Sequence, residues 1–379
     1  MMHLHISLVV PRLLAGLLLL GSLFYSAWAM DPDQGGGIGG TGITGMGPVQ
    51  RFGSIFVNGR EYFLTSDTRI TDDGTTLKES ELHLGDVVVV QGRLETGSGR
   101  SVAARVTVEQ ALRGQVDAVN VSAGTLTVLG QVVHVGRDTF DGSPDNQPLK
   151  LEKVQVGDTL AVSGLLRADG SWAATRVQPV TRSAALRDER FLLRGSLRAV
   201  DKVHGTLTVG AGRVNIDAAR IPANLAVGQA VRITGHYRQG VPYAEGARIE
   251  RLDLGVAGTR LELSGHIQSQ PAAGIATFNG ALLHYGKDTE FAGGRATDLA
   301  QDMPITVQGT LRPDGGITAE RIVLHAEFLR VEPPLPRIEP PQRRMDPADI
   351  HRPEPPSMRP MIERPMPERP MMDRPFSRN

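Results

Sequence analysis

The sequence predicts an all-β protein built from four tandem small barrels, and two observations lead to this prediction. Three sequence landmarks recur together four times between residues 47 and 331. Within each recurrence apolar and polar residues alternate, as in Thr125-Leu126-Thr127-Val128, which is typical of a strand with one buried face. About five short strand signals per unit, with glycines at sharp bends, favour a closed barrel of the OB type. A small sandwich or an SH3-like barrel is the alternative.

The three landmarks agree on one period. A glycine opens the first strand of each unit, at Gly47, Gly114, Gly195 and Gly265. A strand that follows a Gly-Asp turn ends in a glycine, at Gly92, Gly164, Gly235 and Gly309, with intervals of 72, 71 and 74 residues. An arginine precedes a β-branched residue at Arg105, Arg176, Arg248 and Arg321, with intervals of 71, 72 and 73 residues. Self-similarity at a fixed period indicates a repeat architecture.

The strands divide the chain into predicted repeats at 47–110, 111–190, 191–258 and 259–331. A variable polar segment, such as 71–82 in the first repeat, separates the third and fourth strand signals, and a short helical turn or a long loop fits there. Closing each sheet into a barrel removes the edges that would otherwise pair with other chains.

Both ends of the chain differ in composition from the repeats. Residues 30–46 are rich in glycine and predict a flexible linker. Residues 332–379 hold 14 of the 25 prolines. Proline at this density prevents helices and sheet ladders, so we expect a disordered tail with local polyproline II character.

The first 29 residues have the layout of a secretory signal. Arg12 is the one fixed charge, an apolar stretch follows from Leu13 to Phe24, and Ala27-Trp28-Ala29 forms an A-x-A cleavage site. The apolar stretch is shorter than the roughly 20 residues of a membrane-spanning helix. We therefore expect a periplasmic or secreted protein with no transmembrane segment after cleavage. The alternative is an uncleaved anchor in the inner membrane, with the rest of the chain facing the periplasm.

The repeats are similar to a known family. GGGIGGTGITGMGP followed by FGSIFVNGREY, LGDVVVVQGRL and SVAARV resembles the exported bacterial family named domain of unknown function 5666. The resemblance is clearest over 36–110 and extends to about residue 325. It implies exported tandem β domains, and it implies no biochemical role. Two later copies depart from the pattern: the third has Asp217-Ala218 where the others have Asp-Thr, and the fourth lacks the glycine of the Gly-Asp turn.

Composition argues against several classes of function. The chain has 41 basic and 41 acidic residues, so removal of the signal with Arg12 leaves a net charge of −1. Nucleic-acid binders need clustered basic charge and, for single strands, stacked aromatics. Aromatic residues make up 4% of the chain and cysteine is absent, so we expect no nucleic-acid partner and no disulfides.

No motif in the sequence amounts to an active site, a cofactor site or a metal site. Gly35–Gly40 matches G-x-G-x-x-G, but it lacks the flanking strand and helix of a dinucleotide site. The Asp141–Glu152 segment resembles a calcium loop, with Asn146 where that loop needs glycine. His134 and His284 occupy a position that Phe63 and Asn215 take in the other copies.

Two further recurrences also have structural interpretations. Asp-Thr pairs recur before the variable segment, where a carboxylate could gather a cation or a substrate, but we expect them to shape the local turn. They are Asp67-Thr68, Asp138-Thr139 and Asp288-Thr289. Arg-Pro-Met recurs in the tail at Arg359, Arg364 and Arg369; methionine sulfurs could bind Cu(I), but the neighbouring arginines would repel a cation.

The sequence therefore favours a non-enzymatic envelope protein, a binding or spacer scaffold without catalytic, cofactor-binding or metal-binding residues, whose partner is an envelope protein or a glycan. The alternative is a specific binder of oligosaccharide or peptide on a barrel's strand face. A binder needs an exposed aromatic and polar cluster on one barrel, for which Trp172 with Tyr237 or Tyr243 are the candidates.

We expect the exported chain to be cleaved between Ala29 and Met30, since signal peptidase recognises small residues at A-x-A sites. Intact-mass spectrometry of the protein from its native host should give a mature form that begins at Met30. A full-length form confined to the cytoplasm would contradict export.

Overall fold

Four all-β repeats make up the part of the chain that can be described. A computed structural model describes residues 42–328, except 96, 144 and 181–189. The predicted signal, most of the linker and the predicted tail lie outside these residues. Within them, no helix has the length and apolarity needed to cross a membrane.

The strands follow one another in the same order in each repeat. Repeat 1 contains β1 (Gly42–Arg51), β2 (Ile55–Val57), β3 (Arg60–Phe63), β4 (Arg69–Asp72), β5 (Thr75–Thr76), β6 (Val87–Leu94) and β7 (Ser101–Val108). Repeat 2 contains β8 (Gln110–Asn120), β9 (Thr125–Val128), β10 (Gln131–Phe140), β11 (Thr159–Leu166) and β12 (Trp172–Pro179). Repeat 3 contains β13 (Arg190–Asp201), β14 (Thr206–Val209), β15 (Gly212–Ile216), β16 (Ala230–Arg238) and β17 (Val241–Ile249). Repeat 4 contains β18 (Arg260–Ala272), β19 (Ile275–Phe278), β20 (Ala281–His284), β21 (Glu290–Ala292), β22 (Pro304–Leu311) and β23 (Ile317–Leu324).

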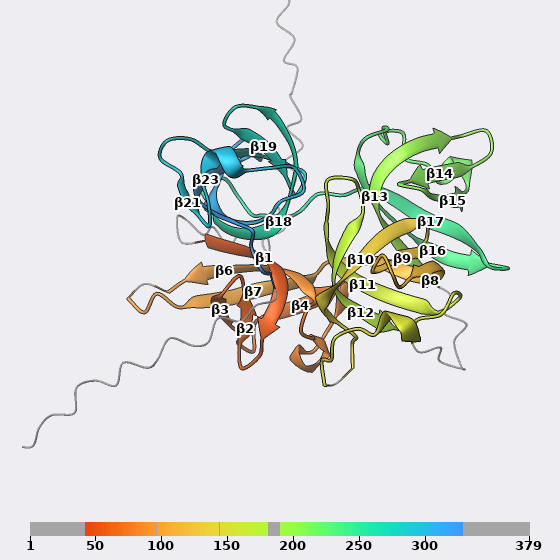
Figure 1. The fold of residues 1–379 in the computed structure, drawn as a ribbon, viewed down its shortest axis with the longest axis horizontal. Helices are drawn as coiled ribbons and strands as arrows, with labels where there is room; N and C mark the ends of the chain where they lie inside the picture. Colours follow the sequence, from red (N-terminus) through yellow and green to blue (C-terminus); the bar gives the residue numbers. More distant parts are fainter. Residues whose placement is uncertain (1–41, 96, 144, 181–189, 329–379) are drawn as a thin grey trace, which may run out of the picture. The chain divides into compact units, whose positions relative to one another are not determined.

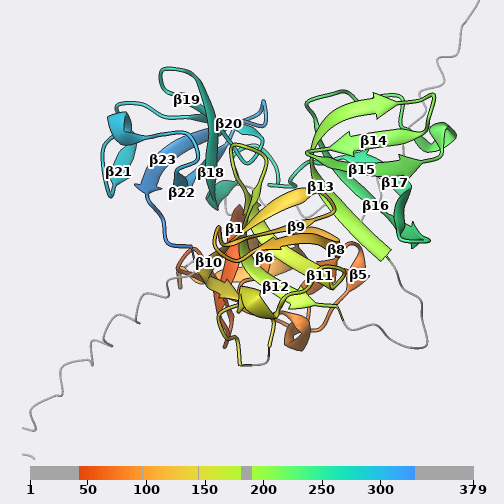
Figure 2. The ribbon, with the colours of Figure 1, turned by 45° about the vertical axis from the view of Figure 1, so that its right-hand side comes forward.

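Each repeat closes into a five-stranded barrel, as predicted (Figure 1 and Figure 2). In repeat 2, β8 pairs with β9, β9 with β10, β10 with β12, β12 with β11, and β11 returns to β8. The β10–β12 pair is parallel and the other pairs are antiparallel. The other repeats close through the same sequence of pairings, which leaves no long open edge.

The closing glycine of each fourth strand permits this closure, although it lies two or three residues before the strand ends, whereas the sequence predicts it at the end itself. At Gly235 an added Cβ would lie 2.0 Å from the carbonyl oxygen of Tyr243 on β17. The register shifts at the same point, where Thr234 pairs with Gly246 but Gly235 pairs with Ala244. A bulge of this kind bends the strand and brings the two backbones together. The equivalent carbonyl contacts at Gly92, Gly164 and Gly309 are 2.3, 2.6 and 2.2 Å.

The variable segment between the third and fourth strands contains one 3₁₀ turn in every repeat, so the predicted helical turn is confirmed. The turns are η2 (Glu79–Glu81), η3 (Leu151–Lys153), η4 (Ala218–Arg220) and η5 (Ala296–Asp298). Each is three residues long, which is the usual length for this strained geometry.

The predicted glycine-rich linker is too long at its C-terminal end. Residues 42–46 belong to β1, which pairs with β6 on one side and with β18 on the other. These two ladders satisfy the backbone and offset the entropic cost of ordering glycine. Gly45 is also required by packing, because a Cβ there would lie 2.4 Å from the hydroxyl of Tyr62.

One arginine landmark was assigned to the wrong position. Arg105, Arg176 and Arg321 lie opposite Gln91, Ser163 and Gln308, each one residue before a closing glycine. In repeat 3 that position is Gly246, while Arg248 lies opposite Arg232. Because side chains alternate along a strand, a shift of two residues keeps Arg248 on the same face, and the sequence spacing did not show the difference.

The repeats are joined by sheet pairing as well as by sequence. All described residues belong to one compact unit. Strand β1 pairs in parallel with β18 from Ile43 to Met46, and β8 pairs antiparallel with β13 at Leu112 and Arg113. Repeats 2 and 3 share a single apolar cluster, and the cluster of repeat 4 also contains Met46, Val87 and Val89 of repeat 1 and Leu165 of repeat 2. Most of the other buried apolar residues of repeat 1 form a cluster of their own.

Alanine at Gly235 should reduce the free energy of unfolding by about 1–3 kcal/mol, since its Cβ would overlap the Tyr243 carbonyl. The matched control is Gly246→Ala on the partner strand, where an added Cβ meets no atom within 4 Å. That change should be neutral or stabilise by up to about 1 kcal/mol through the unfolded chain. Urea denaturation of both variants tests this, and equal effects would show that close approach is not the constraint.

Candidate functional site

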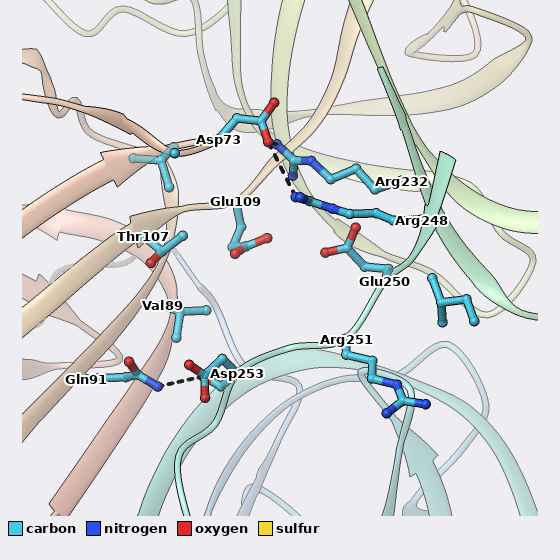
Figure 3. Close-up of a pocket in the computed structure, with 13 residues that line it drawn as sticks. Asp73, Val89, Gln91, Thr107, Glu109, Arg232, Arg248, Glu250, Arg251 and Asp253 are labelled. Carbon is cyan, nitrogen blue, oxygen red and sulfur yellow. Dashed lines mark hydrogen bonds and ion pairs between the residues drawn. The ribbon is translucent and has the colours of Figure 1, made fainter. Parts of the chain in front are cut away.

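Charged side chains from repeats 1 and 3 gather around a cavity of about 240 Å³ (Figure 3). Asp73 comes from the β4–β5 turn, Glu109 follows β7, Arg232 lies on β16 and Arg248 on β17. Glu250, directly after β17, completes the ring of charges. The cavity therefore lies where the ends of several strands meet.

Asp73 links repeat 1 to repeat 3 through two arginines. Its Oδ1 lies 3.0 Å from Nη2 of Arg232 and 3.4 Å from Nη2 of Arg248, as the dashed lines in Figure 3 show. The Arg232 side chain is 3% exposed, while that of Arg248 is 65% exposed. The buried member is the stronger constraint, because exposed ion pairs contribute little.

A third arginine holds the two glutamates. Arg194 on β13 lies 3.0 Å from Oε2 of Glu109 and 3.5 Å from Oε1 of Glu250. Burial raises the pKa of the Glu109 carboxyl above its ordinary value; Arg194 opposes this effect and the like charge of Glu250 adds to it. Arg194 is thus the counter-ion for two largely buried carboxylates, whose side chains are 13% and 16% exposed.

The chemistry of this cavity is that of a structural junction. The acids and arginines that surround it largely neutralise one another, and its volume is below the roughly 300 Å³ of common small-molecule sites. Its lining contains no histidine, serine or cysteine; the groups there that could act as acid or base are carboxylates, of which Asp73 and Glu109 are paired with arginines. Across the described residues, no group of three or more His, Cys, Asp or Glu is placed to hold a metal ion.

A second cavity, of about 380 Å³, lies on repeat 3 alone. Tyr243 lines it, with the Arg238 guanidinium 4.5 Å from its ring centre. Nε of Arg238 lies 2.9 Å from Nε2 of His236, whose Nδ1 lies 3.0 Å from Oε1 of Glu245. This arrangement offers an aromatic face beside hydrogen-bonding groups, which is the composition of a polar ligand site.

Two of the three aromatic candidates from the sequence are structural. Trp172 is buried, and the Arg194 guanidinium lies 6.0 Å from its ring. Tyr237 is also buried; its hydroxyl accepts a hydrogen bond of 2.9 Å from the backbone N–H of Gln115 in repeat 2. Only Tyr243, which is half-buried, lines a cavity, so the structure does not bring the three together as one exposed cluster.

The Asp-Thr pairs have the predicted turn role, and threonine is the active member. In repeat 2, the backbone N–H of Gly136 donates to Oγ1 of Thr139, which donates to the carbonyl of Ala174 on β12. Thr68 and Thr289 make the same pair of bonds in repeats 1 and 4. In repeat 3, Asp217 caps η4 by accepting from the N–H of Ala219.

The remaining sequence candidates are not brought together. His134 and His284 occupy equivalent strand positions, as expected, opposite Ala173 and Thr318 on the fifth strands of different barrels. Asp141 accepts from the N–H of Ser143 at 2.8 Å, and its pKa is lowered first by the hydrogen bond from the Ser143 side chain and then by this backbone bond. The Gly35–Gly40 motif and the Arg-Pro-Met tail lie outside the described residues.

Sequence reasoning missed the two buried arginines, Arg194 and Arg232. A signal was available, since each interrupts an apolar strand, in FLLRGSL and AVRITG. A charged residue among apolar neighbours at a core-facing position needs a partner. The partners could not be named, because Glu109 and Glu250 lie 85 and 56 positions from Arg194, and Asp73 lies 159 positions from Arg232.

Comparison with known proteins gives the family. A profile described as "Domain of unknown function (DUF5666)" matches residues 43–107, 113–178 and 257–323, just over half of the chain. The chain belongs to this family. The profile matches three DUF5666 repeats and passes over repeat 3, which departs from the pattern at Asp217-Ala218, Gln229 and Gly246.

Other comparisons add little. No curated protein matches the chain. Among solved structures, one titled "drosophila Unr CSD456" aligns with 56% of this chain and 98% of its own length at 12% identity, with a TM-score of 0.17. A likeness at that level supports no argument about function.

Replacing Arg194 by Met should destabilise the protein by about 3–5 kcal/mol at pH 8, because Glu109 and Glu250 lose their buried counter-ion. A folded-state pKa raised above the unfolded value favours the folded protein at low pH and costs stability as pH rises. The loss should therefore shrink towards pH 5. Thermal and urea unfolding measure this, with Arg198→Met at an exposed site on the same strand as control; a pH-independent loss would contradict the assignment.

Proposed function

We propose that this DUF5666 chain is a non-catalytic scaffold or spacer of the cell envelope that works outside the cytoplasm. The single observation that carries the proposal is the use of buried charge. Arg176, Arg194 and Arg232 are each buried, and each pairs with a carboxylate in another repeat or in a segment between repeats. The charged groups of a catalytic protein face a substrate, whereas these hold one barrel to the next.

The signal-like N-terminus supports the location. Its layout is that of a chain recognised for export, and the absence of cysteine is compatible with an envelope protein that relies on packing and ion pairs. Repeat contacts by sheet pairing and by ion pair would keep several barrels in a defined order, which is what a spacer requires.

The cavity on repeat 3 favours a second function, specific binding of an oligosaccharide or peptide. Tyr243 could stack on a sugar ring, and Arg238 with His236 could hydrogen-bond to hydroxyl or carbonyl groups. This function needs only one barrel, so it is compatible with a scaffold but is not required by it.

Two measurements test the proposal. Protease treatment of intact spheroplasts should degrade the chain, and a protected chain would contradict a location outside the cytoplasm. Equilibrium dialysis against soluble oligosaccharides released from the cell wall should show no saturable binding if the chain is a spacer alone. Saturable binding lost in Tyr243→Ala, but kept in Tyr285→Ala on repeat 4, would establish the binder instead.

A further inference from the structure

One turn, directly before the fourth strand, is used in repeat 1 to bind repeat 2. The carbonyl of Gly85 accepts a 2.6 Å hydrogen bond from Oγ1 of Thr175, and Oδ1 of Asp86 accepts one of 2.8 Å from Nη1 of Arg176. All four residues are buried by this contact. Thr175 is the bulged residue of β12, since Ser163 pairs with Arg176 and Gly164 with Ala174. The contact therefore joins a Gly-Asp turn to a strand bulge.

Repeat 2 presents the same turn without a partner. Gly157 has φ of 90°, close to the 81° of Gly85. Oδ2 of Asp158 accepts from the N–H of Gln155 at 2.8 Å, as Oδ2 of Asp86 does from His83. Residues 155–158 are nevertheless exposed, with Val156 67% exposed, and an added Cβ on Gly157 meets no atom within 4 Å. Within the described part of the chain, no hydrogen bond reaches Oδ1, the atom that binds arginine in repeat 1.

The equivalent turns of repeats 3 and 4 do not contain the Gly-Asp pair. Repeat 3 has Gln229 in place of the aspartate, so it offers no charge. Repeat 4 has Asp302 in place of the glycine, at φ of 65°, and its carboxylate already binds Arg167 of repeat 2. Among the described repeats, the turn of repeat 2 is the one that is both complete and exposed.

The strand bulge that binds the turn, formed by Thr175 and Arg176 in repeat 2, has an equivalent in repeat 1 to which no turn of the described chain is bound. The bulged residue and its successor are Ala104 and Arg105 in repeat 1, and both are exposed. Arg69 lies opposite Arg105 on the neighbouring strand and is exposed too. Arg105 forms an ion pair with Asp253, with Nη1 3.9 Å from Oδ2, and the pair is weak because the Asp253 side chain is 69% exposed. This surface of repeat 1 therefore carries one small side chain, that of Ala104, and two positive charges, those of Arg69 and Arg105.

The bulges of repeats 3 and 4 would reject an acidic turn. Glu245 and Glu320 occupy the bulge positions there, and repeat 3 has Gly246 where the others have arginine. Arg321 of repeat 4 is already 3.3 Å from Glu290. Like charge at the bulge would oppose Asp158.

We propose that Val156–Asp158 of one chain docks on the Ala104-Arg105 bulge of a second copy, with Asp158 paired to Arg105. The proposed partner is a second copy for two reasons. The contact between repeats 1 and 2 shows that the Gly-Asp turn of one barrel fits the strand bulge of another. The exposed turn carries the negative charge of Asp158, and the exposed bulge carries the positive charge of Arg105. The two surfaces differ, so the contact is heterologous and propagates head to tail into a ring or a filament. The inference goes beyond the scaffold function and does not depend on export.

Sedimentation velocity of the full chain, purified as the cell makes it, tests this over a concentration series. We expect species larger than the monomer whose share rises with concentration and falls with added salt, because the ion pair is partly exposed. Asp158→Arg and Arg105→Asp should each weaken association tenfold or more. Their equimolar mixture should restore it, since every new charge meets its opposite. Gln229→Arg, on the equivalent turn of repeat 3, should have no effect.

Disulfide trapping gives a second readout, because the chain has no cysteine of its own. Chains carrying Asp158→Cys and chains carrying Arg105→Cys, mixed and oxidised, should form mixed dimers in preference to either homodimer. Both sites are exposed, so both variants should fold; Arg105→Cys should keep the unfolding midpoint of the parent, and Asp158→Cys should lose only the turn bond from the N–H of Gln155. A chain that stays monomeric at every concentration, or an assembly that both charge reversals leave unchanged, would overturn the proposal.

Discussion

The close approach of the fourth strand to the fifth is the constraint on which every repeat depends. At the closing glycine, a backbone carbonyl occupies the space that a Cβ would need, at 2.0–2.6 Å in all four repeats. The bulge opposite this glycine bends the fifth strand and directs two consecutive residues outward. Closure thus determines where the Arg105 and Arg176 positions lie, and these positions then serve the contacts between repeats.

The contacts between repeats reuse a few elements in different combinations. The Gly-Asp turn docks on repeat 2 from repeat 1, and the altered turn at Asp302 reaches repeat 2 from repeat 4. First strands pair across repeats as β1 with β18 and as β8 with β13. One repeated domain has therefore diverged into copies that differ mainly in which surfaces are joined. The departures at Asp217, Gln229 and Asp302 are part of that divergence.

The degree of burial distinguishes the ion pairs that stabilise the contacts between repeats from the exposed charges that contribute little to stability. Arg176 and Asp86 are both nearly inaccessible, so removal of either would leave an uncompensated buried charge. Arg248 and Arg105 are largely exposed and contribute less. The same distinction explains why the cavity at Asp73 is a junction, while the cavity at Tyr243, on a single barrel, has groups free to meet a ligand.

The sequence by itself determined the all-β class, the four repeats and the turn role of the Asp-Thr pairs, because these depend on alternation and turn chemistry within a few residues. For the variable segment it left a short helical turn and a long loop as alternatives. It placed Arg248 two residues out of register and ended the linker too late. It also placed a glycine at the start of each first strand, whereas Gly47, Gly114, Gly195 and Gly265 lie inside strands that begin four or five residues earlier. Only the tertiary structure decided which copies of a repeated motif are buried in contacts between repeats and which are exposed. Asp86 and Asp158 stand in almost the same local sequence, yet one is buried against Arg176 and the other is exposed. The reason is that burial of a charge depends on which surfaces meet, and those surfaces come from segments far apart in the chain.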